Sequence, residues 1–197
     1  MSDTHIRLAR PEDGDGIAEI YAPAVRDGAI SFEDVAPDGA AMARRVASVL
    51  PTTPWLVAVR GERLAGYAYA TPHRARAAYR WSVDSSVYVH ADHRRQGVAG
   101  QLMGVLLQLL SLQGFARVHA GVTLPNPGSV GLHESLGFRP VGVYPAVGFK
   151  HGAWHDVGWW SMPLGPRPQA PAEPVPVDEE LLRRALAVTG SRGAPGT

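Results

Sequence analysis

"VDSSVYVHADHRRQGVAGQLMGVLLQLL" occupies residues 83–110 and joins a strand pattern, a basic loop and an apolar helix pattern. Residues 83–90 alternate polar and apolar side chains, which predicts a half-buried strand. Residues 98–113 are apolar enough for a core helix, and Gly114 is suited to end it. The loop between them has the form R-x-x-G-x-A over residues 94–99. A basic, glycine-containing loop therefore precedes the first turn of a buried helix.

Unpaired amides at a helix start, with the positive end of the helix dipole behind them, bind phosphate groups. Gly97 and Ala99 carry little or no side chain, so a pyrophosphate can approach the backbone, and Arg94 and Arg95 add positive charge. The same pattern also fits an ordinary strand–turn–helix connection, and taken alone it leaves both interpretations open. The chain has neither the G-K-[ST] of a nucleotide P-loop nor the G-x-G-x-x-G of a dinucleotide fold.

Length and composition favour one globular domain, because the 197 residues are 45% hydrophobic and 19% charged. The net charge of +1 argues neither for nor against a particular partner, but the lack of a long basic run argues against a nucleic-acid partner. The absence of cysteine excludes disulfides, thiolate metal sites and cysteine nucleophiles. The first ten residues lack an apolar signal core, and the most apolar run, residues 102–112, is too short for a membrane span. We therefore expect a cytoplasmic protein without a membrane partner.

Residues 1–163 read as an α/β domain of mixed strand pairing. Helices are expected from Pro11, kinked or ended by Pro23, then at 41–50, closed by Pro51, and at 129–136, with Gly137 just past the end. Further strands are expected at 5–9, 55–60, 64–70, 117–122, 138–144 and 154–162. Residues 164–197 form a proline-rich tail with a possible short helix at 178–188. We expect removal of the chain after Pro168 to leave turnover nearly untouched.

The R-x-x-G-x-A loop resembles the acetyl-CoA pyrophosphate loop of the GNAT superfamily of N-acetyltransferases, and "SVGLHESLGF" (129–138) looks like that superfamily's second cofactor motif. "LPNPGSVGLHESLGF" (124–138) and "VGFKHGAWHDVGWW" (147–160) are similar to its phosphinothricin N-acetyltransferase branch. The resemblance covers about residues 5–163. It implies a GNAT fold of class α/β (α+β), with a mixed, mostly antiparallel twisted sheet flanked by helices, and acetyl-CoA as co-substrate.

The resemblance also assigns residues to the cofactor. Free amides where the strand splays from its neighbour would hold the pantetheine arm, and the loop would hold the pyrophosphate. The residues implied are Val87, Tyr88, Val89, Arg94, Arg95, Gln96, Gly97, Val98, Ala99, Gly100 and Asn126. For Asn126, the interpretation as an ordinary turn or capping residue remains open.

Acetyl transfer requires an acceptor amine that loses a proton, donors for the developing oxyanion and a proton for the leaving thiolate. Strand alternation places Asp84 on the polar face with Ser86 and Tyr88. The resembled branch has a glutamate there, proposed as general base, so the shorter Asp84 would need a bridging water. By the same resemblance His133 serves as acid or relay. The alternatives are a strand carboxylate paired with an arginine, and a surface histidine on a packing helix.

For the acceptor, "TPHRARAAYRW" (71–81) resembles the substrate loop of that branch, with Arg74, Arg76 and Tyr79 at matching positions and Phe32 as an aromatic neighbour. Guanidinium groups can clamp a carboxylate or phosphinate, although the segment also fits a solvated basic loop. No metal is expected, since the candidates in "HGAWHD" (151–156) would not all face one way on a strand. The resemblance further implies a homodimer formed through the C-terminal region.

The leading hypothesis is an acetyl-CoA-dependent N-acetyltransferase that acts on the α-amine of a small amino-acid-like acceptor by direct attack on the thioester. Phosphinothricin is the named candidate. A second enzyme hypothesis keeps the mechanism and changes the acceptor to methionine sulfone, methionine sulfoximine or another amino acid. A third is an acyl-CoA-binding module with little catalysis. Asp84 decides between them, because catalysis needs a base at that position.

Overall fold

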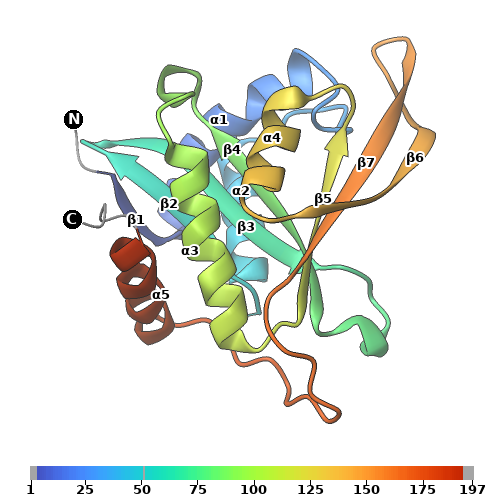
Figure 1. Cartoon of the computed structure of the whole chain (residues 1–197). Coiled ribbons are helices and arrows are strands. Elements are labelled where there is room, and N and C mark those ends of the chain that lie inside the picture. The colour runs from blue at the N-terminus through green and yellow to red at the C-terminus, as the bar shows by residue number, and fades with distance from the viewer. Residues whose placement is uncertain (1–3, 51, 193–197) are drawn as a thin grey trace.

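A seven-stranded mixed sheet forms the centre of the computed structural model, which describes residues 4–50 and 52–192 (Figure 1). The strands are β1 (His5–Leu8), β2 (Trp55–Arg60), β3 (Arg63–Pro72), β4 (Ser82–Val89), β5 (Arg117–Thr123), β6 (Arg139–Lys150) and β7 (Ala153–Pro163). Their order is β1-β2-β3-β4-β5-β7-β6. Among the strands of the described residues, only β4 and β5 pair in parallel. The expected mixed, mostly antiparallel sheet is confirmed.

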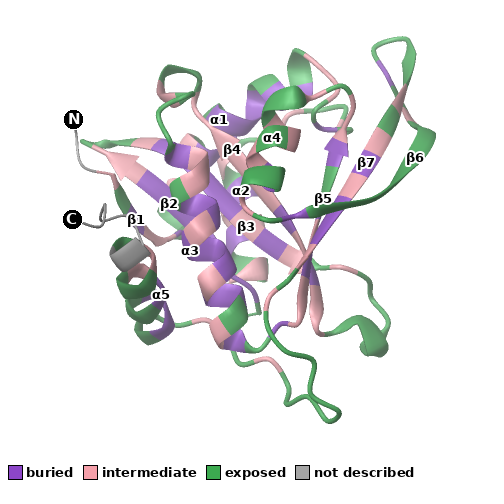
Figure 2. Cartoon of the chain, in the orientation of Figure 1, coloured by how far each residue is buried: buried purple, intermediate pink, exposed green. Residues whose placement is uncertain are grey.

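Helices cover both faces of this sheet. They are α1 (Gly14–Arg26), α2 (Gly39–Val49), α3 (Val98–Gln113), α4 (Pro127–Ser135) and α5 (Glu179–Arg192). One apolar cluster packs α1 and α2 on the sheet, and a second packs α3 and α5 on the other face. Figure 2 shows the buried stripe along α3 and β3 where the second cluster lies. None of the helices in the described part of the chain has the length and apolarity to cross a bilayer.

Pro23 does not end α1, contrary to one half of the sequence-based expectation. The helix continues to Arg26 because Ala24 and Val25 still pack in the apolar core, and Asp27 N donates to Pro23 O at 3.0 Å. Asp38 caps α2 by accepting from the amide of Ala41 at 2.7 Å. The helix-closing role expected of Pro51 lies outside the described residues.

The segment between the last two predicted strands is itself mostly strand. β6 extends to Lys150, and the hairpin turn consists of His151 and Gly152, both with positive φ (50° and 75°). The pairing slips between Tyr144 and Gly148, and this irregularity accommodates Pro145. The result is a long hairpin that extends beyond the body of the sheet (Figure 1).

The proline-rich tail returns along the domain. Its backbone accepts a hydrogen bond from Trp81 Nε1 and exchanges two with Gln113. The predicted helix at 178–188 is α5, which buries Leu181, Leu182 and Ala185 in the cluster around α3. The division into a domain of residues 1–163 and a separate tail stays a prediction. Loss of α5 would nevertheless expose core side chains.

Candidate active site

The site begins where β4 and β5 part. Their parallel pairing covers three positions and stops at Asp84 opposite His119, while β4 stays paired with β3 as far as Val89. The backbone of Ser82 and that of His90 both hydrogen-bond toward β3. Because alternate residues of a strand bond to opposite sides, Val87 and Val89 direct their amides into the gap beside β5. By the same rule, the Tyr88 amide faces β3, so its predicted cofactor contact would have to be made by the side chain.

The loop before α3 presents free amides to the same gap. Gly97 precedes the helix with φ 82°, and the first helical bond runs from Gln101 N to Gly97 O at 3.0 Å. The amides of Val98, Ala99 and Gly100 therefore have no acceptor within the helix. A Cβ built at Gly97 or Gly100 would meet no atom within 4 Å, so the backbone borders open space there. This backbone fits the close approach of a pyrophosphate.

A cavity of about 700 Å³ unites nearly all of the predicted cofactor residues. Its lining includes Val87, Tyr88, Val89, Arg94, Arg95, Gly97, Val98, Ala99, Gly100 and Asn126. Gln96 is the exception, because its side chain donates to Asp92 O and accepts from Arg60 on the outer side of the loop. Pro23 and Ala24 of α1 complete the opposite wall. The sequence carried no signal for that wall, since the contact depends on how α1 packs.

Asn126 is a helix cap at the edge of this cavity. Its Oδ1 accepts from the amide of Ser129 at 3.1 Å and fixes the start of α4. The residue also borders a small neighbouring cavity that contains His133. The capping interpretation is therefore observed, and the predicted contact with the pantetheine arm stays a prediction.

His133 is buried rather than on the surface, with 4% of its area exposed. Its Nδ1 donates to Ser129 O at 2.8 Å, since a carbonyl can only accept, and Nε2 is buried without a partner among the described residues. Burial lowers the pKa of His133, which the hydrogen bond to Ser129 opposes in part. The ring is therefore neutral near pH 7, with its free lone pair on Nε2. It must gain a proton before it can act as the predicted acid.

Asp84 pairs with a histidine, not with an arginine. Its Oδ1 lies 2.6 Å from Nδ1 of His73, at the end of β3. Burial raises the pKa of Asp84, whereas the hydrogen bond and charge of His73 and the charge of Arg74 oppose that shift. The His73 ring stacks on that of His119 with centroids 4.3 Å apart. The sequence reading missed both histidines, because only the strand pairing brings them to Asp84.

A second cavity, of about 340 Å³, lies beyond this group. It is lined by Ile30, Phe32, Gly121, Thr123, Tyr144, Val147, Val157 and Trp159. Phe32 packs flat on β6, since a Cβ at Gly148 would come within 2.2 Å of its ring. Ile30 borders this cavity, the small cavity at His133 and the 700 Å³ cavity. The three cavities share lining residues, so substrates in the two larger cavities would meet near the point where β4 and β5 separate.

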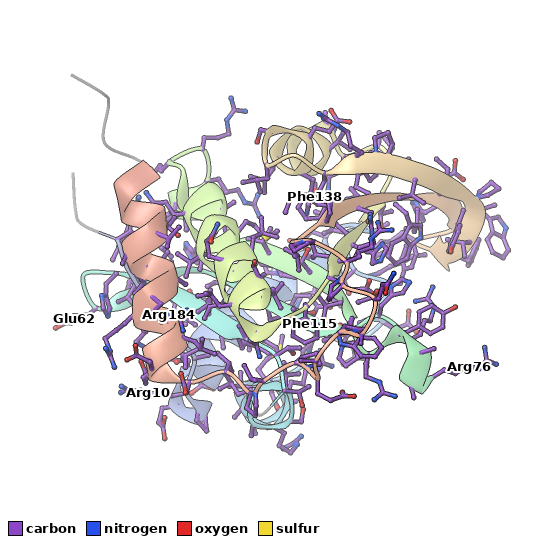
Figure 3. The ribbon with its side chains drawn as sticks, turned by 60° about the horizontal axis from the view of Figure 1, so that its bottom comes forward. Arg10, Glu62, Arg76, Phe115, Phe138 and Arg184 are labelled. Atoms are coloured by element: carbon purple, nitrogen blue, oxygen red, sulfur yellow. The ribbon has the colours of Figure 1, made fainter. Side chains whose placement is uncertain are left out.

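Segment 71–81 places neither Arg74 nor Arg76 in the lining of the 340 Å³ cavity. Arg74 and Arg76 are exposed, and the Arg74 guanidinium donates to the carbonyl of His73 at 2.7 Å. Figure 3 shows Arg76 projecting outward from segment 71–81. Tyr79 lies closer to the site, with its ring 6.0 Å from that of His73. The guanidinium clamp for an acceptor stays a prediction.

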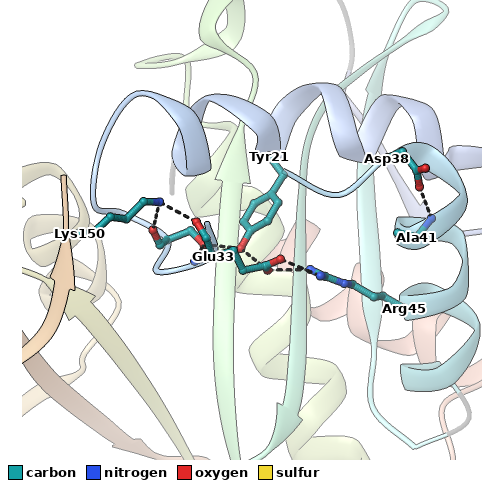
Figure 4. A network of polar contacts seen from close by, with 7 residues as sticks. Tyr21, Glu33, Asp38, Ala41, Arg45 and Lys150 are labelled. Atoms are coloured by element: carbon teal, nitrogen blue, oxygen red, sulfur yellow. Dashed lines mark hydrogen bonds and ion pairs between the residues drawn. The ribbon is translucent and has the colours of Figure 1, made fainter. Parts of the chain in front are cut away.

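A polar network that includes the buried Lys150 holds the loop that carries Ile30 and Phe32 (Figure 4). Lys150, 6% exposed, donates to the carbonyl oxygens of Val25, Ser31 and Glu33 at 2.6, 2.6 and 2.8 Å. Arg45 and the hydroxyl of Tyr21 bind the carboxylate of Glu33. Burial raises the pKa of Tyr21 to about 12, so this hydroxyl remains a donor at neutral pH.

Comparison with known proteins agrees with this geometry. The family model described as Acetyltransferase (GNAT) family matches residues 23–138, which is more than half of the chain. The chain belongs to the GNAT family of acetyltransferases. The resemblance seen in the sequence and the predicted fold are thereby confirmed, and the protein is an N-acetyltransferase by family.

The relatives narrow the class further. The chain is 48% identical over 122 residues to a phosphinothricin N-acetyltransferase of Streptomyces viridochromogenes, covering 60% of this chain and 67% of that one. It is 42% identical over 161 residues to one of Alcaligenes faecalis, covering 81% and 82%. A methionine sulfoximine/methionine sulfone acetyltransferase of Pseudomonas paraeruginosa is 36% identical over 172 residues, covering 84% and 98%.

A solved structure shares the fold and contains the co-substrate. The phosphinothricin acetyltransferase of Sinorhizobium meliloti, crystallised in complex with acetyl-CoA, superposes with a TM-score of 0.83 at 34% identity. The superposition covers 89% of this chain and 96% of that one. The GNAT fold thus binds acetyl-CoA in a relative of nearly the same extent.

Proposed function

We propose that the protein transfers the acetyl group of acetyl-CoA to the α-amine of a small amino-acid-like acceptor, with phosphinothricin as the first candidate. The observation that carries the proposal is the separation of β4 from β5 at Asp84, which opens a cavity lined by unpaired amides. Acylation of phosphinothricin would confer resistance to that compound. We further propose that the protein acts in the cytoplasm, as the sequence analysis predicts.

The chain's own groups have distinct tasks in this reaction. The amides of Val98, Ala99 and Gly100, at the positive end of α3, bind the diphosphate. The amides of Val87 and Val89 bind and orient the pantetheine arm and the thioester. Acetyl-CoA supplies the activated acyl group. Asp84 supplies the carboxylate of the general base that takes a proton from the acceptor ammonium, and the neutral His133 exchanges a proton at Nε2.

The acceptor proposal rests on the 340 Å³ cavity and on the relatives. Phe32 provides an apolar wall, and Arg74, Arg76 and Tyr79 are assigned to the carboxylate and phosphinate groups of phosphinothricin. The sulfone and sulfoximine of methionine are the alternative acceptors, supported by a relative that is 36% identical, against 48% and 42% for the two phosphinothricin enzymes named above. An acyl-CoA-binding module with little catalysis is the remaining alternative.

We also propose a homodimer formed through the hairpin of β6 and β7. This hairpin exposes large apolar side chains, namely Val141, Val143, Tyr144, Val147, Phe149 and Trp154. Exposed large apolar side chains concentrated on one hairpin are typical of a protein–protein interface. Sedimentation of the wild type and of Trp154→Glu tests the proposal, with a dimer expected only for the wild type. A monomeric wild type would contradict it.

The decisive experiment measures release of the coenzyme A thiol with phosphinothricin, methionine sulfone, methionine sulfoximine and simple amines. We expect the highest kcat/KM with phosphinothricin. Asp84→Ala should retain acetyl-CoA binding, measured by calorimetry, and lose thiol release with every amine. A wild type that binds acetyl-CoA but acylates no amine would support the binding-module alternative instead.

The acceptor clamp has its own test. Replacing Arg74 and Arg76 by alanine should raise the KM of the acceptor and leave that of acetyl-CoA unchanged, because both arginines lie outside the 700 Å³ cavity. Equal effects on both substrates would contradict the clamp.

A further inference from the structure

Asp84 has a partner that the proposed reaction does not yet use. The Oδ1 atom of Asp84 and the Nδ1 atom of His73 are 2.6 Å apart, a short hydrogen bond typical of a charge-assisted pair. Both side chains remain partly accessible, with 16% of His73 and 26% of Asp84 exposed. A carboxylate that is already bound to an imidazole is less available to take a proton itself. The imidazole extends the reach of the short aspartate.

The hydrogen bond fixes the tautomer of His73. An ionised carboxylate can only accept, so Nδ1 carries the hydrogen and Nε2 keeps its lone pair. Nε2 makes no hydrogen bond within the described part of the chain. A carboxylate that orients an imidazole and stabilises its protonated form is a recurrent device for proton transfer. His73 and Asp84 have this arrangement.

The contacts of His73 place it beside the 340 Å³ cavity, where we propose that the acceptor binds. Its ring meets Trp159 edge to face at 6.0 Å, and Trp159 lines the 340 Å³ cavity. The titratable and charged groups around His73 come from separate elements. They are Asp84 on β4, His119 on β5, and Arg74 and Tyr79 in segment 71–81. Burial lowers the pKa of His119, as do the charges of His73 and Arg74. Of the two stacked imidazoles, only His73 has a carboxylate to stabilise its charged form.

We propose that His73 is the catalytic residue that takes a proton from the acceptor ammonium and that Asp84 is the positioning residue which holds its imidazole. The proposal rests on the proposed amine acetylation. One N–H proton passes to Nε2 of His73, and Nδ1–H remains bonded to Asp84. The amine lone pair then forms the C–N bond as the C–S bond breaks, and the electron pair of that bond leaves on the thiolate. The thiolate takes a proton, the nitrogen loses its second proton, and one proton is released to solvent in total.

The test compares His73→Gln with His119→Gln, a matched control that changes the stacked ring and keeps the hydrogen bond between His73 and Asp84. We expect His73→Gln to lower kcat/KM about 100-fold or more with ammonium acceptors. Its kcat/KM should rise steadily with pH up to the titration of the amine, because only neutral amine can react. The wild type should instead reach a plateau above an imidazole titration. His119→Gln should keep that plateau.

Three further measurements exclude a merely structural effect. Acetyl-CoA affinity, measured by calorimetry, should be unchanged in His73→Gln, which also verifies folding. With a weakly basic acceptor such as a hydrazide, neutral at assay pH, the loss should shrink to a few-fold. Asp84→Asn should shift the imidazole limb of the pH profile without abolishing it.

Two outcomes overturn the proposal, and they are distinguishable from failure of the proposed function. An active wild type whose pH profile is unchanged in His73→Gln removes His73 from the chemistry and leaves the acetyltransferase intact. Equal losses of kcat/KM in His73→Gln and His119→Gln would mean that both histidines only stabilise the structure. A wild type that acylates no amine at all would refute the proposed function, and the role of His73 with it.

Discussion

Lys150→Met tests whether the buried ammonium of Lys150 holds the acceptor side of the site together. The substitution keeps the length of the side chain and removes three hydrogen bonds to the carbonyls of Val25, Ser31 and Glu33. Those carbonyls end α1 and shape the loop that carries Ile30 and Phe32. In the variant they lose a charged donor at a site that is 6% exposed.

The expected decrease in the free energy of unfolding follows from these three hydrogen bonds. Hydrogen bonds to charged groups contribute about 1.5–3 kcal/mol each, and the variant gains part of this back because it no longer buries a charge. We therefore expect the free energy of unfolding to fall by about 3 kcal/mol. For a chain of this length, that loss corresponds to a Tm lower by roughly 6–12 °C. The acceptor KM should rise, because the loop lines the 340 Å³ cavity.

Urea and thermal unfolding measure the first effect, and steady-state kinetics with both substrates measure the second. Arg139→Met is the matched control, since Arg139 lies on the same strand, is exposed and should cost less than about 0.5 kcal/mol. A Lys150→Met protein as stable as this control would refute the reasoning. An acceptor KM that is unchanged would show that the network stabilises the fold without shaping the site.

Three further predictions concern the cofactor loop, the tail and pH. Gly97→Glu should abolish acetyl-CoA binding in calorimetry, because a carboxylate would face the diphosphate. Gly97→Ala should retain measurable binding, and equal affinities for the two variants would contradict this prediction. Leu182→Ala should lower the free energy of unfolding by about 2–4 kcal/mol, since the residue is 3% exposed. Truncation after Pro168 should lower Tm more than this single change, and an unaltered Tm would contradict this. The expectation that truncation leaves turnover nearly untouched stays a prediction. Burial would raise the pKa of Asp13, but hydrogen bonds from Arg7 and the amide of residue 10 outweigh it and hold the pKa below its usual range. The stability from this pair is therefore complete above about pH 4 and lost as pH falls through the lowered pKa, so Asp13→Asn should flatten the acid limb of urea unfolding.

Local patterns predicted the elements that their own residues determine. β2 and α3 have the predicted bounds, 55–60 and 98–113. An apolar run followed by Gly61 marks β2, and an apolar run between Gly97 and Gly114 marks α3. The loop at 94–100 was predictable for the same reason, since a glycine between a strand and a helix leaves amides unpaired wherever the rest of the chain lies.

Other features depend on packing between distant segments. His73 and His119 reach Asp84 only through the register of β3, β4 and β5, which no single strand pattern specifies. The contacts of Lys150 lie more than a hundred residues away in the sequence. The sequence did contain a signal, not used above, that another element such as α5 packs on α3. The run at 98–113 is apolar on nearly every side, and such a helix must be covered on both faces, here by the sheet and by α5.

The burial of Lys150 determines whether acetyl-CoA can acylate the lysine of the protein itself. Lys150 is the only lysine in the sequence, so the chain has a single ε-amine. That nitrogen is charged, enclosed and bound by three oxygens, and it offers no lone pair to an acylating agent. A protein that works beside a reactive thioester is thereby protected from self-modification at lysine.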